Sequence, residues 1–469
     1  MRGSTELACK FTSLEWLKLY GYAPYGFFKK LGIQGPKPLP FIGTFLEYKR
    51  GLFIFDNDCY QKYGDVWGLF DGRLPVMGVM DTAMIKTILV KECYSVFTNR
   101  RDFGLNGELH DAVTTVEDNE WKRIRSTLSP SFTSGRLKDV KTHINLVKFL
   151  QKKVDSDEVL EVKEIFGAYS MDVVASSAFS VDIDSINQPN DPLVVNIKKL
   201  LKFNLLSPLL ILVVLFPFMR PLLEKCKVSF LPAGAMKFFY SFLRKIKAER
   251  SKNVLLVFSR AERLCCGCVP GLTDHEILSQ ALTYIFGGYE TSSSTLGYLS
   301  YNLATNPDVQ AALQDEIDKI FPDKMEYLDM VINETLRVYP IISRLERVAK
   351  ATVEVNGVTI PKGTVVMIPI MVLHHHPTHW PKPEVFRPER FSKENRENID
   401  PYTFLPFGMG PRNCIGMRFA LQTIKLVIVE ILQNFSFVTC KETELFDNGF
   451  VAPTKPIKLK LVPRVLAPS

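Results

Sequence analysis

A cysteine near the C-terminus stands where it could present a metal ligand. Cys414 lies in the Gly/Pro-rich segment 407–416, and the apolar stretch 417–432 that follows is expected to be a helix. Backbone N–H groups of such a loop and the helix N-terminus favour the ionised thiol, which is the form that binds metals. Taken alone, the residue favours the simpler interpretation of a buried thiol at a turn.

Two spacings place chemically capable side chains on one helix face. Glu334 and Arg337 are three residues apart and can pair, although an exposed pair of this kind adds almost nothing to stability. Trp121 and Arg125 are four residues apart, and without further information they are ordinary surface residues. Inside another helical stretch, the pair Gly287–Gly288 weakens the helix by about 1 kcal/mol per glycine, which is also compatible with close helix packing.

The elements that must position these residues are predicted to be mainly helices. Thr273 and Glu276 form a capping box that starts a helix extending to about Ala304. Asn306–Pro307 begins the next helix, and a further one spans about 325–338. Two small hairpins are predicted at Asp71–Gly72 and at Asn356–Gly357, because each pair separates two runs rich in apolar residues.

Composition limits the class of protein. The chain has 469 residues, of which 46% are hydrophobic and 23% charged, so a disordered chain is excluded. Lys and Arg number 58 against 50 Asp and Glu. This diffuse basic excess fits an acidic partner or an anionic membrane face, and no nucleic-acid interaction is expected because no basic block is interleaved with aromatic residues.

The cysteine content and the hydropathy of the sequence indicate the cellular environment of the chain. Nine cysteines without regular spacing argue against a secreted disulfide scaffold and for a reducing environment. No stretch of eighteen apolar residues predicts a transmembrane helix. The run 205–218 could dip into a bilayer surface or be part of the core. Prolines at 36, 38 and 40 indicate a boundary between a membrane-proximal tail without a clear anchor, 1–34, and a folded domain, 35–469.

The cysteine segment resembles the haem-binding signature F-x-x-G-x-R-x-C-x-G of cytochromes P450. Its fixed positions are occupied by Phe407, Gly410, Arg412, Cys414 and Gly416. Three further motifs occur in the family's order, and the resemblance runs from about residue 27 to 462. Segments 91–101 and 166–173 are most similar to vertebrate family 3, subfamily A enzymes. The resemblance implies the cytochrome P450 fold, which is mainly α with small β sheets.

The resemblance assigns roles on the haem side. Cys414 would be the axial thiolate of haem b, with Phe407 packed beside the sulfur. Glu334 and Arg337 would form a buried structural network with Arg390 of the segment Pro-Glu-Arg-Phe. The haem propionates would be bound by Arg100, Trp121, Arg125, Arg347 and Arg412.

It also assigns roles on the substrate side. The segment 287–292 fits the pattern A/G-G-x-D/E-T-T/S, whose weakened turn would make room for dioxygen. Thr291 would hydrogen-bond dioxygen or an ordered water, and Glu290 would help relay protons from solvent. The walls of the substrate pocket would include Phe103, Thr114, Thr115, Phe203, Phe286, Ile342 and Ser343, together with Thr291.

The function implied is that of a haem-thiolate monooxygenase acting on steroids, drugs and other lipophilic compounds. Electrons would come from NADPH through cytochrome P450 reductase, with cytochrome b5 as a further partner. Contacts with the reductase are predicted at Lys122, Arg123, Arg418 and Lys425. The chain would sit at the cytosolic face of the endoplasmic reticulum membrane, peripherally or weakly anchored.

Alternatives remain open at this stage. The segments 253–272, 324–325 and the one after 444 look shortened or altered relative to the family, so a catalytically silent variant that binds haem or ligand is the second hypothesis. A carrier of apolar ligands without haem is the third. We expect His374–His376 with His379 to form a loop face rather than a metal site, because consecutive residues point in different directions and no carboxylates that would support the rings are apparent. The cysteines at 265, 266 and 268 are not expected to bind a metal either, because zinc-finger spacing is lacking.

Overall fold

The structure is a computed structural model that describes residues 19–132, 143–179, 181–201, 207–249, 271–319, 325–445 and 455–464. The chain divides into two compact units. Unit 1 is built from Met1–Leu105, Asn204–Val228 and Arg344–Val372, and unit 2 from Asn106–Phe203, Ser229–Ser343 and Leu373–Ser469.

Unit 1 contains most of the β structure. Its four-stranded sheet has the order β1-β2-β7-β4, in which β2 and β7 are parallel and the other two pairs antiparallel. The strands of unit 1 are β1 (Val66–Asp71), β2 (Leu74–Val79), β4 (Arg344–Val348), β5 (Val353–Val355), β6 (Val358–Ile360) and β7 (Val365–Pro369). Its helices are α2 (Phe27–Lys30), α3 (Leu52–Tyr63), α4 (Thr82–Lys86), α9 (Pro208–Leu215) and α10 (Arg220–Lys225).

Both predicted hairpins are present in unit 1. The turn between β1 and β2 contains Gly72 at φ 60°. Between β5 and β6, Asn356 and Gly357 have φ angles of 48° and 77°. Positive φ at both central residues matches the right-handed twist of the strands, which is why an Asn-Gly pair specifies this hairpin.

Unit 2 is mainly helical. Its helices are α5 (Asp118–Leu128), α6 (His143–Asp155), α7 (Val162–Phe179), α8 (Pro192–Leu201), α11 (Ala233–Glu249), α13 (Asp274–Thr305), α14 (Pro307–Ile317), α15 (Glu326–Val338), α17 (Lys393–Arg396) and α18 (Met417–Asn434). Strands β3 (Leu160–Glu161), β8 (Phe435–Val438) and β9 (Lys458–Pro463) form a small sheet of order β3-β9-β8. Along the chain, α16 (Ile370–His374) contains the change from unit 1 to unit 2.

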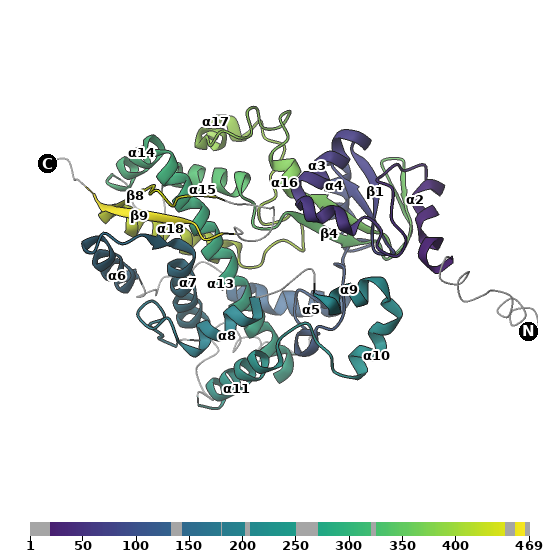
Figure 1. Ribbon diagram of the computed structural model, residues 1–469, viewed down its shortest axis with the longest axis horizontal. Helices are drawn as coiled ribbons and strands as arrows, with labels where there is room; N and C mark the ends of the chain where they lie inside the picture. Colours follow the sequence, from purple (N-terminus) through teal and green to yellow (C-terminus); the bar gives the residue numbers. More distant parts are fainter. Residues whose placement is uncertain are drawn as a thin grey trace, which may run out of the picture. The chain divides into compact units, whose positions relative to one another are not determined.

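Helix α13 is the central helix of unit 2, and its start was predicted correctly. The Thr273 hydroxyl accepts from the Glu276 N–H at 3.2 Å, and the Glu276 carboxylate accepts from the Thr273 N–H at 2.7 Å. Further along, Leu282, Leu296 and Leu299 are fully buried in the hydrophobic core. Figure 1 shows α7 running alongside α13.

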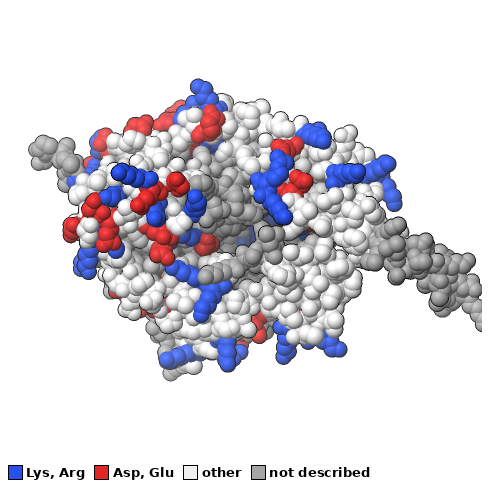
Figure 2. All heavy atoms as spheres, viewed as in Figure 1, with Lys and Arg blue, Asp and Glu red and all other residues white. Residues whose placement is uncertain are grey.

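Surface charge and hydropathy agree with the composition. Over the part of unit 2 that holds α14, β8 and β9, Figure 2 shows acidic and basic atoms interspersed on the face that is drawn. Within the described ranges, no helix is both long enough and apolar enough to cross a membrane.

Candidate functional site

The loop before α18 presents Cys414 at the surface of unit 2. The Cys414 N–H donates to the Phe407 carbonyl at 2.9 Å and so closes the loop, while Gly408 and Gly410 adopt φ angles of 69° and 74° that favour glycine. Helix α18 begins three residues after the cysteine, with Gly416 as its N-cap. The cysteine is exposed and lies near a helix N-terminus, where negative charge is favoured.

Open space adjoins this loop. Gly416 has φ −88°, so its backbone does not require glycine. A Cβ built at Gly416 would meet no described atom within 4 Å. The small residue therefore leaves room beside Cys414, as a flat prosthetic group needs.

Arg412 is buried and held by the backbone. Its Nη1 and Nη2 donate to the carbonyls of Val113 and Val116 at 3.3 and 2.7 Å. The guanidinium carbon lies 4.4 Å from the ring centroid of Trp121, which is buried on α5. These contacts fix the cation beside the cysteine loop, so its position does not depend on a bound group.

Arg125 links α5 to the residue before the cysteine. Its Nη1 donates to the carbonyl of Asn413 at 3.0 Å, and its Nη2 to the side-chain oxygen of Asn413 at 2.9 Å. The structure thus brings Trp121, Arg125 and Arg412 together around the cysteine loop within unit 2. The sequence offered no signal for Asn413 as the connecting residue.

The other two predicted propionate partners lie in unit 1. Val348 of β4 donates its N–H to the Asn99 carbonyl at 2.9 Å, which brings Arg100 next to Arg347. Arg347 is 1% exposed, and within the described part of the chain its Nε and Nη2 have no hydrogen-bond partner. Burial and the nearby Arg100 charge lower the pKa of Arg347 to about 10. A buried guanidinium with unpaired donors fits an anionic ligand such as a carboxylate.

Glu334 is the centre of a buried charge network. Arg337 donates to both carboxylate oxygens of Glu334 at 2.8 Å, and neither side chain is exposed. Arg390, in the short helix η9 (Pro388–Phe391), donates from Nε to the same carboxylate at 3.2 Å. The Arg387 N–H adds a further bond at 2.9 Å. The expected trio is therefore assembled.

Both arginines of the network also hold the chain that leads to the cysteine loop. Arg337 donates to the carbonyls of His374 and Pro383, at 2.9 and 2.8 Å. Arg390 donates to the carbonyls of Pro381 and Lys382, at 2.8 and 2.7 Å. The segment between α16 and the cysteine loop lacks long regular elements, so these side chains supply bonds that a sheet or helix would otherwise provide.

His374 has a structural role that the sequence interpretation missed. We expected the histidine run to form a loop face, and for His374 this was wrong, because the side chain is fully buried. Its Nε2 accepts from the Leu405 N–H at 2.9 Å. Burial, assisted by the charges of His375 and Arg337, lowers the pKa of His374 to about 3. The neutral ring therefore fixes Leu405, two residues before Phe407.

The two adjacent glycines of α13, Gly287 and Gly288, have different surroundings. A Cβ at Gly288 would lie 2.6 Å from Cγ2 of Val174 on α7, so this glycine permits close packing of the two helices. A Cβ at Gly287 would meet no described atom within 4 Å. Thr291 lies one turn further and donates its hydroxyl to the Gly287 carbonyl at 2.6 Å. The open side of α13 is thus at Gly287 and Thr291.

Glu290 is bound by a lysine that the sequence did not identify. Lys163 of α7 donates to the Glu290 carboxylate at 2.8 Å and to the Ser294 hydroxyl at 2.6 Å. Burial lowers the pKa of Lys163, and the charge of Glu290 partly offsets this effect. The carboxylate expected to relay protons is therefore engaged in an ion pair with α7. The partners are 127 positions apart in the sequence, so spacing along the chain carries no signal for this contact.

The residues predicted to line the substrate pocket share partial exposure. In unit 2, Phe286 and Ile342 are 38% and 49% exposed. The exposed Thr114 and the half-buried Thr115 and Ser343 belong to the same unit. Phe103 is 40% exposed in unit 1. Phe203 lies outside the described residues.

Several sequence features cannot be placed. Cysteines 265, 266 and 268 lie outside the described residues, as do most of the altered segment 253–272 and residue 324. The shortened segment after residue 444 is described only in part.

Comparison with known proteins identifies the family. The family model Cytochrome P450 matches residues 33–461. Cytochrome P450 3A40 of Oryzias latipes is 58% identical over 476 residues, covering 96% of this chain and 95% of the relative. Cytochrome P450 3A1 of Rattus norvegicus is 51% identical, covering 95% of this chain and 94% of the relative.

The chain belongs to the cytochrome P450 family. Its fold, mainly helical with small sheets, agrees with this assignment, as the signature around Cys414 predicted. The chain is a haem-thiolate monooxygenase that oxidises lipophilic compounds, including steroids and xenobiotics, with electrons from NADPH delivered by a reductase. The comparisons do not favour the hypothesis of a catalytically silent variant. Membership of the family excludes the hypothesis of an apolar-ligand carrier without haem.

The Glu334 network predicts a severe effect of one isosteric change. Glu334→Gln would leave Arg337 and Arg390 buried with no charge to balance them, which costs about 3–5 kcal/mol. We expect a lower free energy of unfolding in denaturant titrations and a much smaller yield of haem-containing protein.

Glu389→Gln is the matched control, because Glu389 is exposed on the same short helix as Arg390. A surface change of this kind alters stability by about 0.5 kcal/mol or less. Equal stability of the two variants would show that the Glu334 network does not hold this segment.

Proposed function

We propose that Cys414 is the residue that binds the haem iron, as a thiolate. The observation that carries this proposal is the exposed cysteine in a closed loop with open space at Gly416. Bound haem supplies the activation of dioxygen, and a thiolate ligand promotes O–O cleavage by donating electron density. The loop orients the sulfur, and the Phe407 carbonyl accepts the hydrogen bond from the Cys414 N–H that closes the loop.

Five side chains are proposed to bind the haem propionates: Arg100, Trp121, Arg125, Arg347 and Arg412. Support is strongest for Arg347, whose buried Nε and Nη2 have no partner within the described residues. Arg412 and Arg125 are already oriented by backbone carbonyls and by Asn413. Donors fixed before the ligand arrives lose little conformational entropy when they bind it.

Thr291 is proposed to hold a water or dioxygen on the open side of α13. Its hydroxyl proton is directed to the Gly287 carbonyl, so the hydroxyl oxygen retains acceptor capacity toward the open side. Glu290 is proposed as a proton donor only when its ion pair with Lys163 opens. In the closed pair its role is to fasten α13 to α7.

Substrate binding is proposed at the partly exposed residues Phe286, Ile342, Thr114, Thr115 and Ser343 of unit 2, with Phe103 of unit 1 and Phe203. The set is apolar with a few hydroxyls, which suits bulky lipophilic molecules.

The reductase is proposed to contact Lys122, Arg123, Arg418 and Lys425, of which Lys122 and Arg418 are exposed. Arg123 is ion-paired with Glu276, and Lys425 is ion-paired with Asp329 at 2.6 Å. Cytochrome b5 is proposed as a further acidic partner, by resemblance to the family.

Attachment to the cytosolic face of the endoplasmic reticulum membrane is proposed through unit 1. Phe218 and Leu222 are 67% and 58% exposed just after α9. Tyr20 stacks on Phe216 with ring centroids 6.4 Å apart, and Tyr22 is 58% exposed. Together these apolar side chains give unit 1 a surface suited to the boundary between lipid headgroups and acyl chains.

The ligand assignment predicts the outcome of one substitution. Cys414→Ser should abolish the red-shifted Soret band of the reduced, carbon monoxide-bound protein, because a serine oxygen does not replace the thiolate. Cys226→Ser is the control, since Cys226 is also exposed. A Cys414→Ser protein that keeps the band would refute the assignment.

The role of Thr291 predicts a loss of coupling. Thr291→Ala should keep the Soret band and should still consume NADPH. The amount of product formed per NADPH should fall by about tenfold or more. Thr283→Ala is the matched control, because Thr283 makes the same hydroxyl-to-carbonyl bond on the same helix, to Ser279 at 2.8 Å. Unchanged product per NADPH in Thr291→Ala would overturn the role.

The membrane proposal is tested by sedimentation with vesicles of endoplasmic reticulum lipids. Replacing both Phe218 and Leu222 with Asp should reduce the bound fraction several-fold, because charged side chains are disfavoured in the apolar layer. Val385, an exposed apolar residue of unit 2, provides the control variant Val385→Asp. Undiminished binding of the double variant would exclude this surface as the contact.

A further inference from the structure

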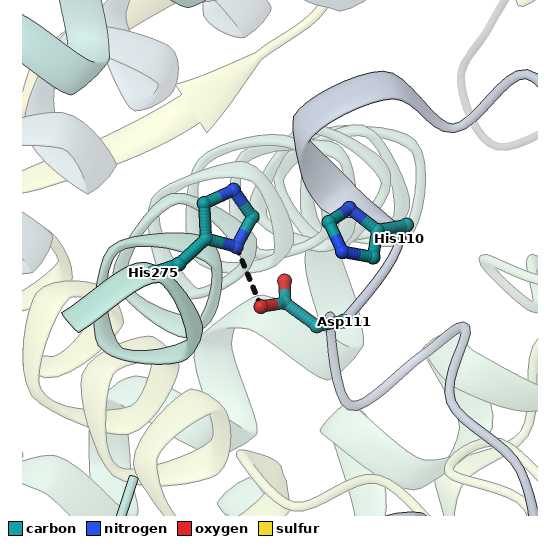
Figure 3. A group of neighbouring side chains, drawn as sticks. All are labelled: His110, Asp111 and His275. Carbon is teal, nitrogen blue, oxygen red and sulfur yellow. Dashed lines mark hydrogen bonds and ion pairs between the residues drawn. The ribbon is translucent and has the colours of Figure 1, made fainter. Parts of the chain in front are cut away.

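Three side chains near the start of α13 form a cluster with the composition of a metal site. Among the described residues, His110, Asp111 and His275 are the group whose potential ligand atoms all lie within 4.8 Å of one another. His110 and Asp111 follow the short helix η4 (Gly107–Leu109), and His275 belongs to the first turn of α13. Figure 3 shows the Asp111 carboxylate between the two imidazole rings. None of the three belongs to the predicted haem or substrate residues.

Neighbouring groups orient both histidines. Nδ1 of His110 lies 3.1 Å from the Gly107 carbonyl, which can only accept, so Nδ1 carries the proton and Nε2 keeps its lone pair. His275 donates from Nε2 to the Glu108 carboxylate at 2.9 Å and from Nδ1 to the Asp111 carboxylate at 2.6 Å, so a metal ion would displace the Nδ1 proton. A carbonyl or carboxylate behind each ring is the usual arrangement around metal-binding histidines.

Asp111 provides an independent indication of a missing ligand. The residue is 7% exposed, and its Oδ1 is buried without a hydrogen-bond partner in the part of the chain that the structure describes. Leaving a buried carboxylate oxygen unpaired is costly. The other oxygen lies 2.6 Å from Nδ1 of His275. A cation between the rings would satisfy the unpaired oxygen.

We propose that His110, Asp111 and His275 bind a divalent transition-metal ion. Two imidazole nitrogens and one carboxylate oxygen suit zinc, with water in the fourth position. Zinc requires ligand atoms about 3.3 Å apart, given bonds of about 2.0 Å in tetrahedral geometry. The potential ligand atoms lie within 4.8 Å of one another, so the side chains must rearrange to reach this spacing. His110 is exposed and can supply this movement, whereas His275 is half-buried and bonded to two carboxylates.

The ion would fasten α13 to the segment that holds Arg412. Gln280 of α13 already donates to the Asp111 carbonyl at 2.7 Å and accepts from the Val113 N–H at 2.7 Å. Val113 in turn accepts from Arg412. A metal at the first turn of α13 would add a further link to this segment, and its consequence would be greater thermal stability of the loaded protein.

The test measures zinc binding by the full-length, haem-containing protein without a histidine tag. After equilibrium dialysis against zinc in a buffer that does not chelate it, bound zinc is counted by mass spectrometry. We expect one ion per chain at this cluster, and a rise of the melting temperature with zinc. His110→Ala and His275→Gln should each weaken binding by more than tenfold, and Glu108→Gln by about tenfold, the usual effect of removing a group behind a ligand.

His379→Ala is the matched control, since His379 is exposed and has His376 as a ring neighbour at 5.0 Å. Because His110 is exposed, His110→Ala should fold, which its unchanged Soret band would verify. Zinc binding of wild-type strength in both His110→Ala and His275→Gln, or no zinc on the wild-type protein, would overturn the proposal.

Discussion

A carboxylate removed from water must be matched by cations and N–H donors, and Glu334 is the clearest case in this chain. It receives bonds from Arg337, from Arg390 and from the Arg387 backbone N–H. Because the same two arginines also bind carbonyls between residues 374 and 383, one ion network determines the path of an irregular segment. Replacing such a network by apolar residues could preserve stability, but it would remove the bonds that specify this path.

The same principle distinguishes the remaining buried arginines. Arg412 is satisfied in part by carbonyls of its own unit, so its position is determined before any ligand binds. Arg347 is equally buried, yet within the described residues two of its nitrogens are unpaired and its pKa is lowered to about 10. The carbonyls hold Arg412 in place, whereas the unpaired nitrogens of Arg347 are suited to an anion. A haem propionate is the anion that the family supplies, and Arg347 is therefore the most informative of the five proposed partners.

Local signals in the sequence predicted local structure well. The capping box at Thr273, the hairpin at Asn356–Gly357 and the ends of α15 depend on neighbours within four residues, and each was confirmed. The family signature around Cys414 supplied the fold class and the haem.

Contacts between distant residues were beyond this reasoning. Lys163 binds Glu290 from another helix, and His374 is buried by packing that a run of three histidines does not reveal. The two glycines of α13 also needed the structure, which assigns close packing to Gly288 and open space to Gly287. Each of these cases depends on which elements meet in space, and periodicity along one chain does not contain that information.

The central claim is that the sulfur of Cys414 binds iron. X-ray absorption at the iron edge of the purified haem protein measures the iron's neighbours directly. The account predicts one sulfur neighbour in addition to the porphyrin nitrogens, and that this sulfur is absent when Cys414 is replaced. An iron surrounded by nitrogen and oxygen alone in the unmodified protein would contradict it.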